Sequence, residues 1–259
     1  RRKLNRLGLI EVGDISWPEH VGIFTIPFKV AVSFGINLLI YGENSQNEYG
    51  GPDKAARTTD LDRRWLEEFG GLLGMRVSDL ADAYGIPKRD LTAYEYPSAS
   101  QLLQYAVKGL FLGQFFPWDG FENFQVARES GFEGLTHDVE GSIGNYENLD
   151  NHQTGIHDYF KFLKFGFGRA TDIASVHIRR GRMTRSEAIN LVNTRDGQFP
   201  WSYLGKELKD VLEPLEISVE QFIETCDRFT NREIFLTDSS GELVKDAKGN
   251  LKKRFELVK

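Results

Sequence analysis

Two segments near the start of the chain carry the clearest hydrophobic pattern. From Val21 to Ser33 apolar residues recur at helical spacing, which predicts a helix, and Pro27 within it predicts a kink or a late start. Gly35 predicts a turn. Residues 36–41 are a nearly continuous apolar run, typical of a buried strand in a parallel sheet. Helix, turn and buried strand in this order indicate part of an α/β fold.

Downstream of about residue 60 the pattern changes to short helices joined by polar loops. Three reciprocal capping boxes, in which each end of the motif bonds a backbone amide, predict helix starts at Ser98-x-x-Gln101, Thr184-x-x-Glu187 and Ser218-x-x-Gln221. Rings between residues 111 and 124, among them Phe115 and Phe116, are interpreted as core. After Thr230 alternation with turn signals predicts a terminal β-hairpin or small meander.

Composition narrows the classes of partner. The 259 residues include 32 Lys and Arg against 38 Asp and Glu, a net charge of −6, which argues against a broad nucleic-acid surface. The only cysteine, Cys226, excludes an internal disulfide and a cysteine zinc cluster and suits a reducing cytoplasm. The most apolar stretch is too interrupted to span a bilayer, and no secretory signal is visible. We therefore expect a cytoplasmic protein with neither a nucleic-acid nor a membrane partner.

The loop after the first predicted strand is rich in oxygen ligands. It runs from Gly42 to a glycine pair and contains Glu43, Asn44, Asn47 and Glu48. Ligands of open α/β sheets bind at the carboxyl ends of strands, where this loop lies. Carboxylates and carboxamides of this kind can hold hydrated magnesium or a sugar hydroxyl. The alternative is a solvated surface loop.

A second constellation spans residues 155–172. His157, Lys161 and Lys164 fall on one helical face, with Phe160 and Leu163 beneath them. The next predicted helix has Arg169 in its first turn, and Arg169 with the amides of that turn can bind a phosphate. Asp172 lies three residues further on. The alternative is an ordinary Arg/Asp surface pair at a helix junction.

The last candidate for a binding site is one dense run of basic residues. Arg179, Arg180 and Arg182 are better suited to a phosphate or a nucleotide-sugar diphosphate than to a nucleic-acid backbone, and a solvated face is the alternative. The five histidines have no recognised metal spacing. Neither a Gly-x-Ser-x-Gly elbow nor a Walker loop is present, which disfavours a covalent nucleophile.

Distinctive strings lie along nearly the whole chain: WPEHVGIF at 17–24, YGENSQNEYGG at 41–51, FPWD at 116–119, NYENLD at 145–150, GIHDYFKFLKFGFGRATD at 155–172, GRMTR at 181–185 and RFTN at 228–231. Together they resemble the N-acetyl sugar amidotransferase family of bacterial surface-polysaccharide and flagellin-glycan biosynthesis, including lipopolysaccharide O-antigen. The resemblance implies an ATP pyrophosphatase of the adenine-nucleotide α-hydrolase type. Such an enzyme adenylates the acetamido oxygen of an N-acetylated sugar, and ammonia then displaces AMP to leave an acetamidino group.

The resemblance also implies the organisation of the chain. It implies that residues 1–60 are the C-terminal part of a partial Rossmann-like parallel-sheet domain. The residue pattern adds a mainly helical substrate or partner region at 61–231 and a β-hairpin tail at 232–259. The implied cofactors are ATP and Mg²⁺, and the implied partners are a glutaminase that supplies ammonia and, in some cases, a cyclase-like subunit. The family's pyrophosphate-binding Ser-Gly-Gly-x-Asp-Ser loop is absent from these 259 residues. We expect it upstream of Arg1, and we expect this chain to be inactive alone.

Residue roles follow from the resemblance only at matching positions. Glu43, Asn44, Arg169 and Asp172 become candidate catalytic residues, with Glu43 the candidate magnesium ligand. The resemblance also makes Gly42, His157, Asp158 and Thr171 candidate substrate or nucleotide contacts. The oxygen-rich loop adds Asn47 and Glu48 to these contacts, and the basic run adds Arg179 and Arg182. We expect the loop at 42–51 and the helix that starts at Arg169 to share one cleft.

Two other functions are compatible with the sequence. The chain can be a non-catalytic module that binds a sugar nucleotide or docks a glutaminase. A weaker interpretation keeps the ATP chemistry but takes tRNA as substrate, as thiolation enzymes do. The acidic balance and the absence of cysteine pairs disfavour tRNA.

Overall fold

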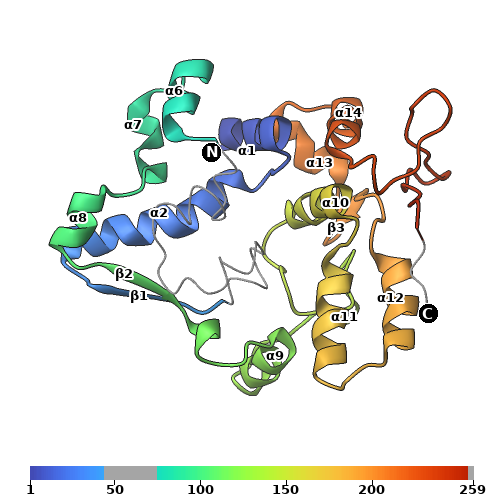
Figure 1. The fold of residues 1–259 in the computed structure, drawn as a ribbon, viewed down its shortest axis with the longest axis horizontal. Helices are drawn as coiled ribbons and strands as arrows, with labels where there is room; N and C mark the ends of the chain where they lie inside the picture. The colour runs from blue at the N-terminus through green and yellow to red at the C-terminus, as the bar shows by residue number, and fades with distance from the viewer. Residues whose placement is uncertain (44–74, 256–259) are drawn as a thin grey trace. The chain divides into compact units, whose positions relative to one another are not determined.

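Helices and short strands make up the described part of the chain, residues 1–43 and 75–255 of a computed structural model (Figure 1). Two compact units divide it. The sheet unit is Trp17–Trp118, and the helical unit joins Arg1–Ser16 to Asp119–Lys259. The predicted boundary at residue 60 lies outside the described residues, and the predicted three-part division stays a prediction. Among described residues, no helix is long and apolar enough to cross a membrane.

The sheet unit pairs two parallel strands. Strand β1 (Leu38–Tyr41) aligns with β2 (Lys108–Phe111), from Leu38 opposite Lys108 to Tyr41 opposite Phe111. This pairing confirms the predicted α/β class with a parallel sheet. The other elements of the unit are α2 (Trp17–Phe34), α6 (Val77–Tyr84), α7 (Lys88–Leu91), the 3-10 turns η2 (Thr92–Tyr94) and η3 (Leu112–Gln114), and α8 (Ala99–Gln104).

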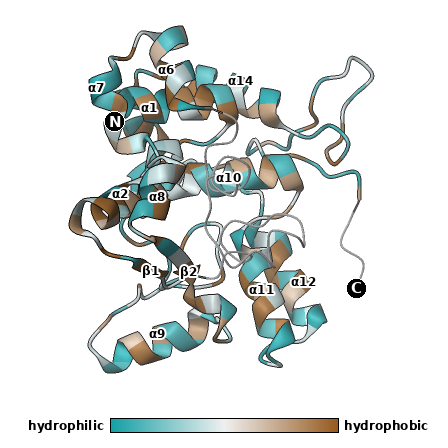
Figure 2. Ribbon diagram, turned by 60° about the vertical axis from the view of Figure 1, so that its left-hand side comes forward, coloured by the Kyte–Doolittle hydropathy of each residue, from teal (hydrophilic) through white to brown (hydrophobic). Residues whose placement is uncertain are grey.

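Helix α2 covers one face of this sheet. Its buried Phe24 lies with its ring centroid 5.5 Å from that of Tyr41 and 6.3 Å from that of Phe111. Side chains on a strand alternate between faces. Leu38 and Ile40 therefore point the other way and are 45% and 63% exposed, and the hydropathy colours of Figure 2 mark apolar residues in β1. The prediction of a strand buried on both faces is wrong for these two residues.

The predicted turn at Gly35 is confirmed, since this residue has a φ of +67° where α2 ends. Pro27 lies inside α2 and does not delay the helix start. Proline has no amide hydrogen, so the Ile23 carbonyl four residues earlier lacks its usual helical donor. The Tyr41 hydroxyl donates to that carbonyl at 3.3 Å. Burial, and then the charge of Glu43, raise the pKa of Tyr41, which keeps this hydroxyl protonated.

The helical unit begins with α1 (Arg2–Leu7) and the π-helix η1 (Gly8–Val12). It continues with α9 (Gly120–Glu129), α10 (Thr154–Phe165), α11 (Arg169–Arg179), α12 (Arg185–Arg195), the antiparallel strands β3 (Ser202–Tyr203) and β4 (Lys206–Glu207), α13 (Leu208–Leu212), the 3-10 turn η4 (Glu213–Leu215) and α14 (Val219–Phe229). Its core surrounds α10, whose Phe160 packs with Phe222 and Phe229.

Local sequence signals describe both units well. All three predicted capping boxes form, at the starts of α8, α12 and α14. The terminal hairpin is confirmed by antiparallel bridges between Thr237 and Leu243 and between Lys245 and Leu251. The interpretation of Phe115 and Phe116 as core is wrong, because both rings are mostly exposed in the short turn that follows β2.

The Tyr41 hydroxyl gives a prediction that a double-mutant cycle can test. Tyr41→Phe should lower the free energy of unfolding by about 1 kcal/mol, because a partly buried carbonyl loses its donor. In a Pro27→Ala background the same change should cost close to nothing, because the amide restored at residue 27 donates to Ile23. Chemical denaturation of the four proteins measures both values. An equal loss in the two backgrounds would show that the hydroxyl does not replace the proline's missing amide.

Candidate functional site

Helix α10 presents the predicted cationic face. Phe160 and Leu163 are buried beneath it, and His157, Lys161 and Lys164 lie above, as expected. Each of the three is engaged within the helical unit. Lys161 donates to Asp172 of α11, His157 Nδ1 lies 3.2 Å from the buried carboxylate of Asp14, and Lys164 donates to the Val12 and Gly13 carbonyls at 2.8 and 3.1 Å. Carboxylates and backbone carbonyls of the same unit therefore already engage all three side chains of this face.

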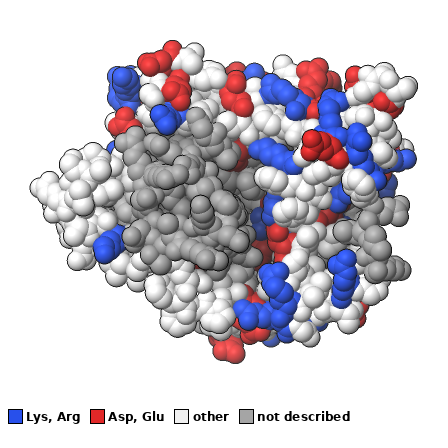
Figure 3. Space-filling view, in the orientation of Figure 1, with Lys and Arg blue, Asp and Glu red and all other residues white. Residues whose placement is uncertain are grey.

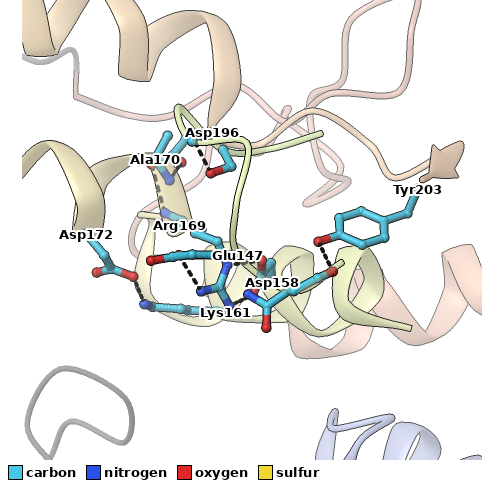
Figure 4. Close-up of polar contacts among 12 residues, drawn as sticks. Glu147, Asp158, Lys161, Arg169, Ala170, Asp172, Asp196 and Tyr203 are labelled. Carbon is cyan, nitrogen blue, oxygen red and sulfur yellow. Dashed lines mark hydrogen bonds and ion pairs between the residues drawn. The ribbon is translucent and has the colours of Figure 1, made fainter. Parts of the chain in front are cut away.

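Arg169 joins α11 to α10. Its Nε and Nη2 donate to the two carboxylate oxygens of Asp158 at 2.6 and 2.8 Å, a bidentate pair (Figure 4). Its Nη1 reaches Glu147 Oε2 at the longer distance of 3.5 Å. Bidentate pairs of this kind are among the strongest charged contacts in proteins. With Lys161 and Asp172, these three residues form what we call the charged network.

The two carboxylates beside Arg169 have opposite pKa shifts. Burial raises the pKa of Asp158. The charge and hydrogen bonds of Arg169 lower it by more than burial raises it, so the pKa of Asp158 lies below its usual value. For Glu147 burial dominates over the weaker contact to Arg169, and the charges of Asp158 and Asp172 add to it, so its pKa is raised. Of these two carboxylates, Glu147 thus takes up a proton more readily.

The start of α11 is held by a residue outside the helix. Its N-cap, Gly168, has no side chain, and Asp196 at the end of α12 substitutes for one. The Asp196 carboxylate accepts from the Gly168 and Ala170 amides at 2.8 and 3.1 Å and from the Thr171 hydroxyl at 2.6 Å (Figure 4). A carboxylate here satisfies free amides and complements the helix dipole. Burial raises the pKa of Asp196 despite these bonds.

Glycine is required at position 168 for this contact. A Cβ there would lie 2.7 Å from Asp196 Oδ1. The amides and the guanidinium expected to bind phosphate at this helix start are therefore bonded to Asp196 and Asp158. The phosphate roles of Arg169 and Thr171 stay predictions, and a phosphate would have to displace one of these carboxylates.

The basic residues at the end of α11 and just after it lie in two different environments. Arg179 is exposed. Arg182 donates from Nη2 to both Asp119 oxygens at 2.8 and 2.7 Å, and its guanidinium lies 5.0 Å from the Phe121 ring centroid. Burial raises the pKa of Asp119, but Arg182 and the first amides of α9 lower it more. Figure 3 likewise shows acidic and basic side chains interspersed where α11 and α12 lie, not gathered by sign.

The candidate loop of the sheet unit is described only at its start. Gly42 and Glu43 follow β1, and the Gly113 amide donates to the Glu43 carbonyl at 3.2 Å. Asn44, Asn47 and Glu48 lie outside the described residues. Among those described, Glu43 belongs to no cluster of three metal-ligating side chains, so the donor set for magnesium seen here is one carboxylate. The shared cleft with Arg169 stays a prediction.

A cavity of about 240 Å³ lies beside the charged network in the helical unit. Asp158 and Arg169 line one part of it, and the segment after α12 lines another with Asp196, Phe199 and Trp201. Tyr203 of β3 also lines it, with its hydroxyl 3.3 Å from the Asn148 carbonyl. No local sequence signal marks Asp196 or Tyr203, because their partners lie far away in sequence. Glu147 belongs to one of the strings of the resemblance, which assigned it no role.

Comparison with known proteins identifies the segment that carries this site. Residues 123–248 match a family described as the C-terminal domain of WbpG-like lipopolysaccharide biosynthesis proteins. The matched segment contains the charged network, Asp196 and the cavity-lining aromatic residues. No curated protein matches the chain.

The pKa of Asp158 is lowered and that of Glu147 is raised, so substitutions of these two residues form a matched test. Asp158→Asn should lower the free energy of unfolding by about 2 kcal/mol at neutral pH, because it leaves a partly buried guanidinium poorly paired. Glu147→Gln should cost less than about 1 kcal/mol, since it removes only the longest contact. Denaturant titrations of both variants and the wild type measure these losses.

The pH dependence of the two losses has opposite sign. A lowered native pKa means that the Asp158 contribution is present above the unfolded-state pKa and lost as pH falls through the native value. A raised native pKa means that the Glu147 contribution is present below the unfolded-state pKa and lost as pH rises through the native value. Equal costs for the two variants at every pH would refute this assignment.

Proposed function

We propose that the complete protein is an ATP-dependent amidotransferase, because residues 123–248 match a family described as the C-terminal domain of WbpG-like lipopolysaccharide biosynthesis proteins. It converts the N-acetyl group of a sugar, in our proposal a nucleotide-linked one, to an acetamidino group. The family match carries this proposal. The sequence strings that resemble sugar amidotransferases support it, because two of them, NYENLD and GIHDYFKFLKFGFGRATD, supply the residues of the charged network.

The proposed reaction replaces one oxygen by an NH group. The acetamido oxygen attacks the α-phosphorus of ATP, and pyrophosphate leaves. Ammonia then adds to the activated carbon, the bond from carbon to oxygen breaks, and the oxygen leaves within AMP. An amide oxygen is a poor leaving group, and adenylation makes it a good one. Magnesium bound with ATP would stabilise charge on the departing pyrophosphate.

The geometry gives Arg169 a specific part in this proposal. Its contact to Glu147 is the longest of its three, so an incoming phosphoryl oxygen can replace Glu147 while the bidentate bond to Asp158 keeps the guanidinium in place. Protonation of Glu147, favoured by its raised pKa, would assist that exchange. Asp172 would act through Lys161, and Thr171 through the start of α11.

The other candidates have less direct support. The proposed contacts for the sugar or pyrophosphate remain His157, Asp158, Arg179 and Arg182. Of these, His157 is oriented by its contact to Asp14. Gly42, Glu43, Asn44, Asn47 and Glu48 remain proposed contacts for the nucleotide and magnesium.

Ammonia comes from a partner glutaminase, with or without a cyclase-like subunit. A glutaminase of the cysteine type needs an accessible thiolate. The only cysteine of this chain, Cys226, is buried on α14, and burial raises its pKa well above the usual value. Cys226 is therefore unsuited to attack glutamine.

One observation favours a second function, a non-catalytic module that binds a sugar nucleotide or docks the glutaminase. Lys161, Arg169 and Arg182 each have a carboxylate partner within the helical unit. A purely structural role for these pairs would leave none of these three cations for the transition state. Turnover by the complete protein separates the two functions.

We expect the complete natural protein with ATP, Mg²⁺, ammonium and the N-acetylated sugar to form AMP and a product one mass unit lighter. Arg169→Lys should reduce AMP formation on the order of 100-fold, because lysine cannot reproduce the bidentate contact. Arg232→Lys, at an exposed arginine outside the network, is the matched control and should keep full activity. Mass spectrometry and AMP quantification give the readout. Formation of ADP, or sugar binding without turnover, would count against the amidotransferase.

A further inference from the structure

The cavity beside the charged network has the size of a single ring. Its volume of about 240 Å³ lies below the roughly 300–1,000 Å³ typical of pockets for drug-sized ligands. A nucleotide sugar, with two rings, a base and a diphosphate, is too large for it. One pyranose or one base fits.

Aromatic rings form one wall of this cavity. Trp201 is 47% exposed, although it is among the largest apolar side chains of the unit. Its indole is held in place, because Nε1 donates to the Lys248 carbonyl at 3.1 Å and the ring centroid of Phe199 lies 4.5 Å away. An exposed aromatic ring held rigidly is suited to stacking against a flat ligand face.

The rest of the lining is polar and balanced in charge. Three carboxylates, Glu140, Asp158 and Asp196, and two guanidinium groups, Arg169 and Arg195, line the cavity. The guanidinium groups are paired, Arg169 with Asp158 and Arg195 with Asp138 at 3.0 Å. A diphosphate would meet a lining with more acidic than basic groups, whereas hydroxyl groups can donate to carboxylates and accept from guanidinium groups.

Close packing keeps the cavity in this form. A Cβ at Gly155 of α10 would lie 2.7 Å from the Tyr203 ring, so glycine permits the strand to approach the helix there. Gly197 has a φ of +79°, which favours glycine, and directs the chain from Asp196 toward Phe199 and Trp201. The aromatic wall and the charged groups are thus held by the same turn.

We propose that this cavity binds one uncharged pyranose ring of the substrate, with its C–H face on Trp201 and its hydroxyl groups toward Asp158 and Asp196, while the Glu147-facing nitrogen of Arg169 stays available to the phosphoryl group. The identity of the ring as the N-acetylated sugar rests on the proposed function. The cavity's preference for a neutral ring over a nucleotide rests on its size, aromatic wall and charge. The nucleotide part of the substrate therefore lies outside this cavity.

Direct binding tests the proposal without ATP or turnover. N-acetylglucosamine and N-acetylgalactosamine are titrated into the complete protein, and saturation-transfer NMR reports contact of each sugar with the protein. At least one should bind saturably, and Trp201→Ala should weaken its binding at least tenfold. Phe132→Ala removes an aromatic ring of similar exposure, 42%, outside the cavity lining and should leave binding unchanged. Thermal melting checks that both variants fold, and Trp201→Phe, which keeps a ring, should retain part of the affinity.

Two competitors make the test selective. AMP and UDP should not displace the sugar. Displacement by AMP that depends on Trp201 would make the cavity an adenine site, and displacement by UDP would show that the cavity accepts a diphosphate. Either result overturns the proposal. The proposal is also overturned if neither sugar binds, or if Trp201→Ala binds the sugar as well as the wild type does. The experiments can reject the proposed function and the proposed sugar cavity independently of each other. Turnover with Trp201-independent sugar binding rejects only the cavity, whereas Trp201-dependent binding without AMP formation rejects only the amidotransferase.

Discussion

The candidate site depends on one carboxylate that caps a helix to which it does not belong. Asp196 ends α12 and bonds the Gly168 and Ala170 amides and the Thr171 hydroxyl at the start of α11. The two helices can approach closely because Ala170, Ala174 and Ala188 pack between them. With its first turn fixed in this way, α11 directs Arg169 onto Asp158 of α10. Replacing Gly168 by any larger residue would disturb both contacts.

This constraint connects the charged network to the cavity. Asp158, Arg169 and Asp196 belong to the cavity lining, and the turn after Asp196 carries Phe199 and Trp201 into it. In our proposal, protein stability and ligand recognition therefore use the same side chains. A ligand at Arg169 would exchange with the loosely held Glu147, while Asp158 and Asp196 keep the start of α11 in place. In our proposal this is how a site whose cations are already paired can still bind a substrate.

The sequence predicted what short-range signals encode. Three capping boxes, the turn at Gly35, the parallel strand and the terminal hairpin each depend on residues close in sequence, and all are confirmed. The role of Asp196 could not be predicted, because its partner Gly168 lies 28 residues away. The exposure of Ile40 and Phe116 was also missed, since apolar character does not tell which face of an element another element covers. His157, Asp158, Arg169 and Asp172 were selected by resemblance, and the structure brings them together on α10 and α11.

Amide hydrogen exchange tests the capping by Asp196 most directly. In the wild type the Gly168 and Ala170 amides should be protected, and Asp196→Ala should remove that protection. The Glu187 amide, capped by Thr184 at the start of α12, is the internal reference and should keep its protection in both proteins. If Asp196→Ala leaves the Gly168 and Ala170 amides as protected as in the wild type, the carboxylate does not hold α11 and the account is contradicted.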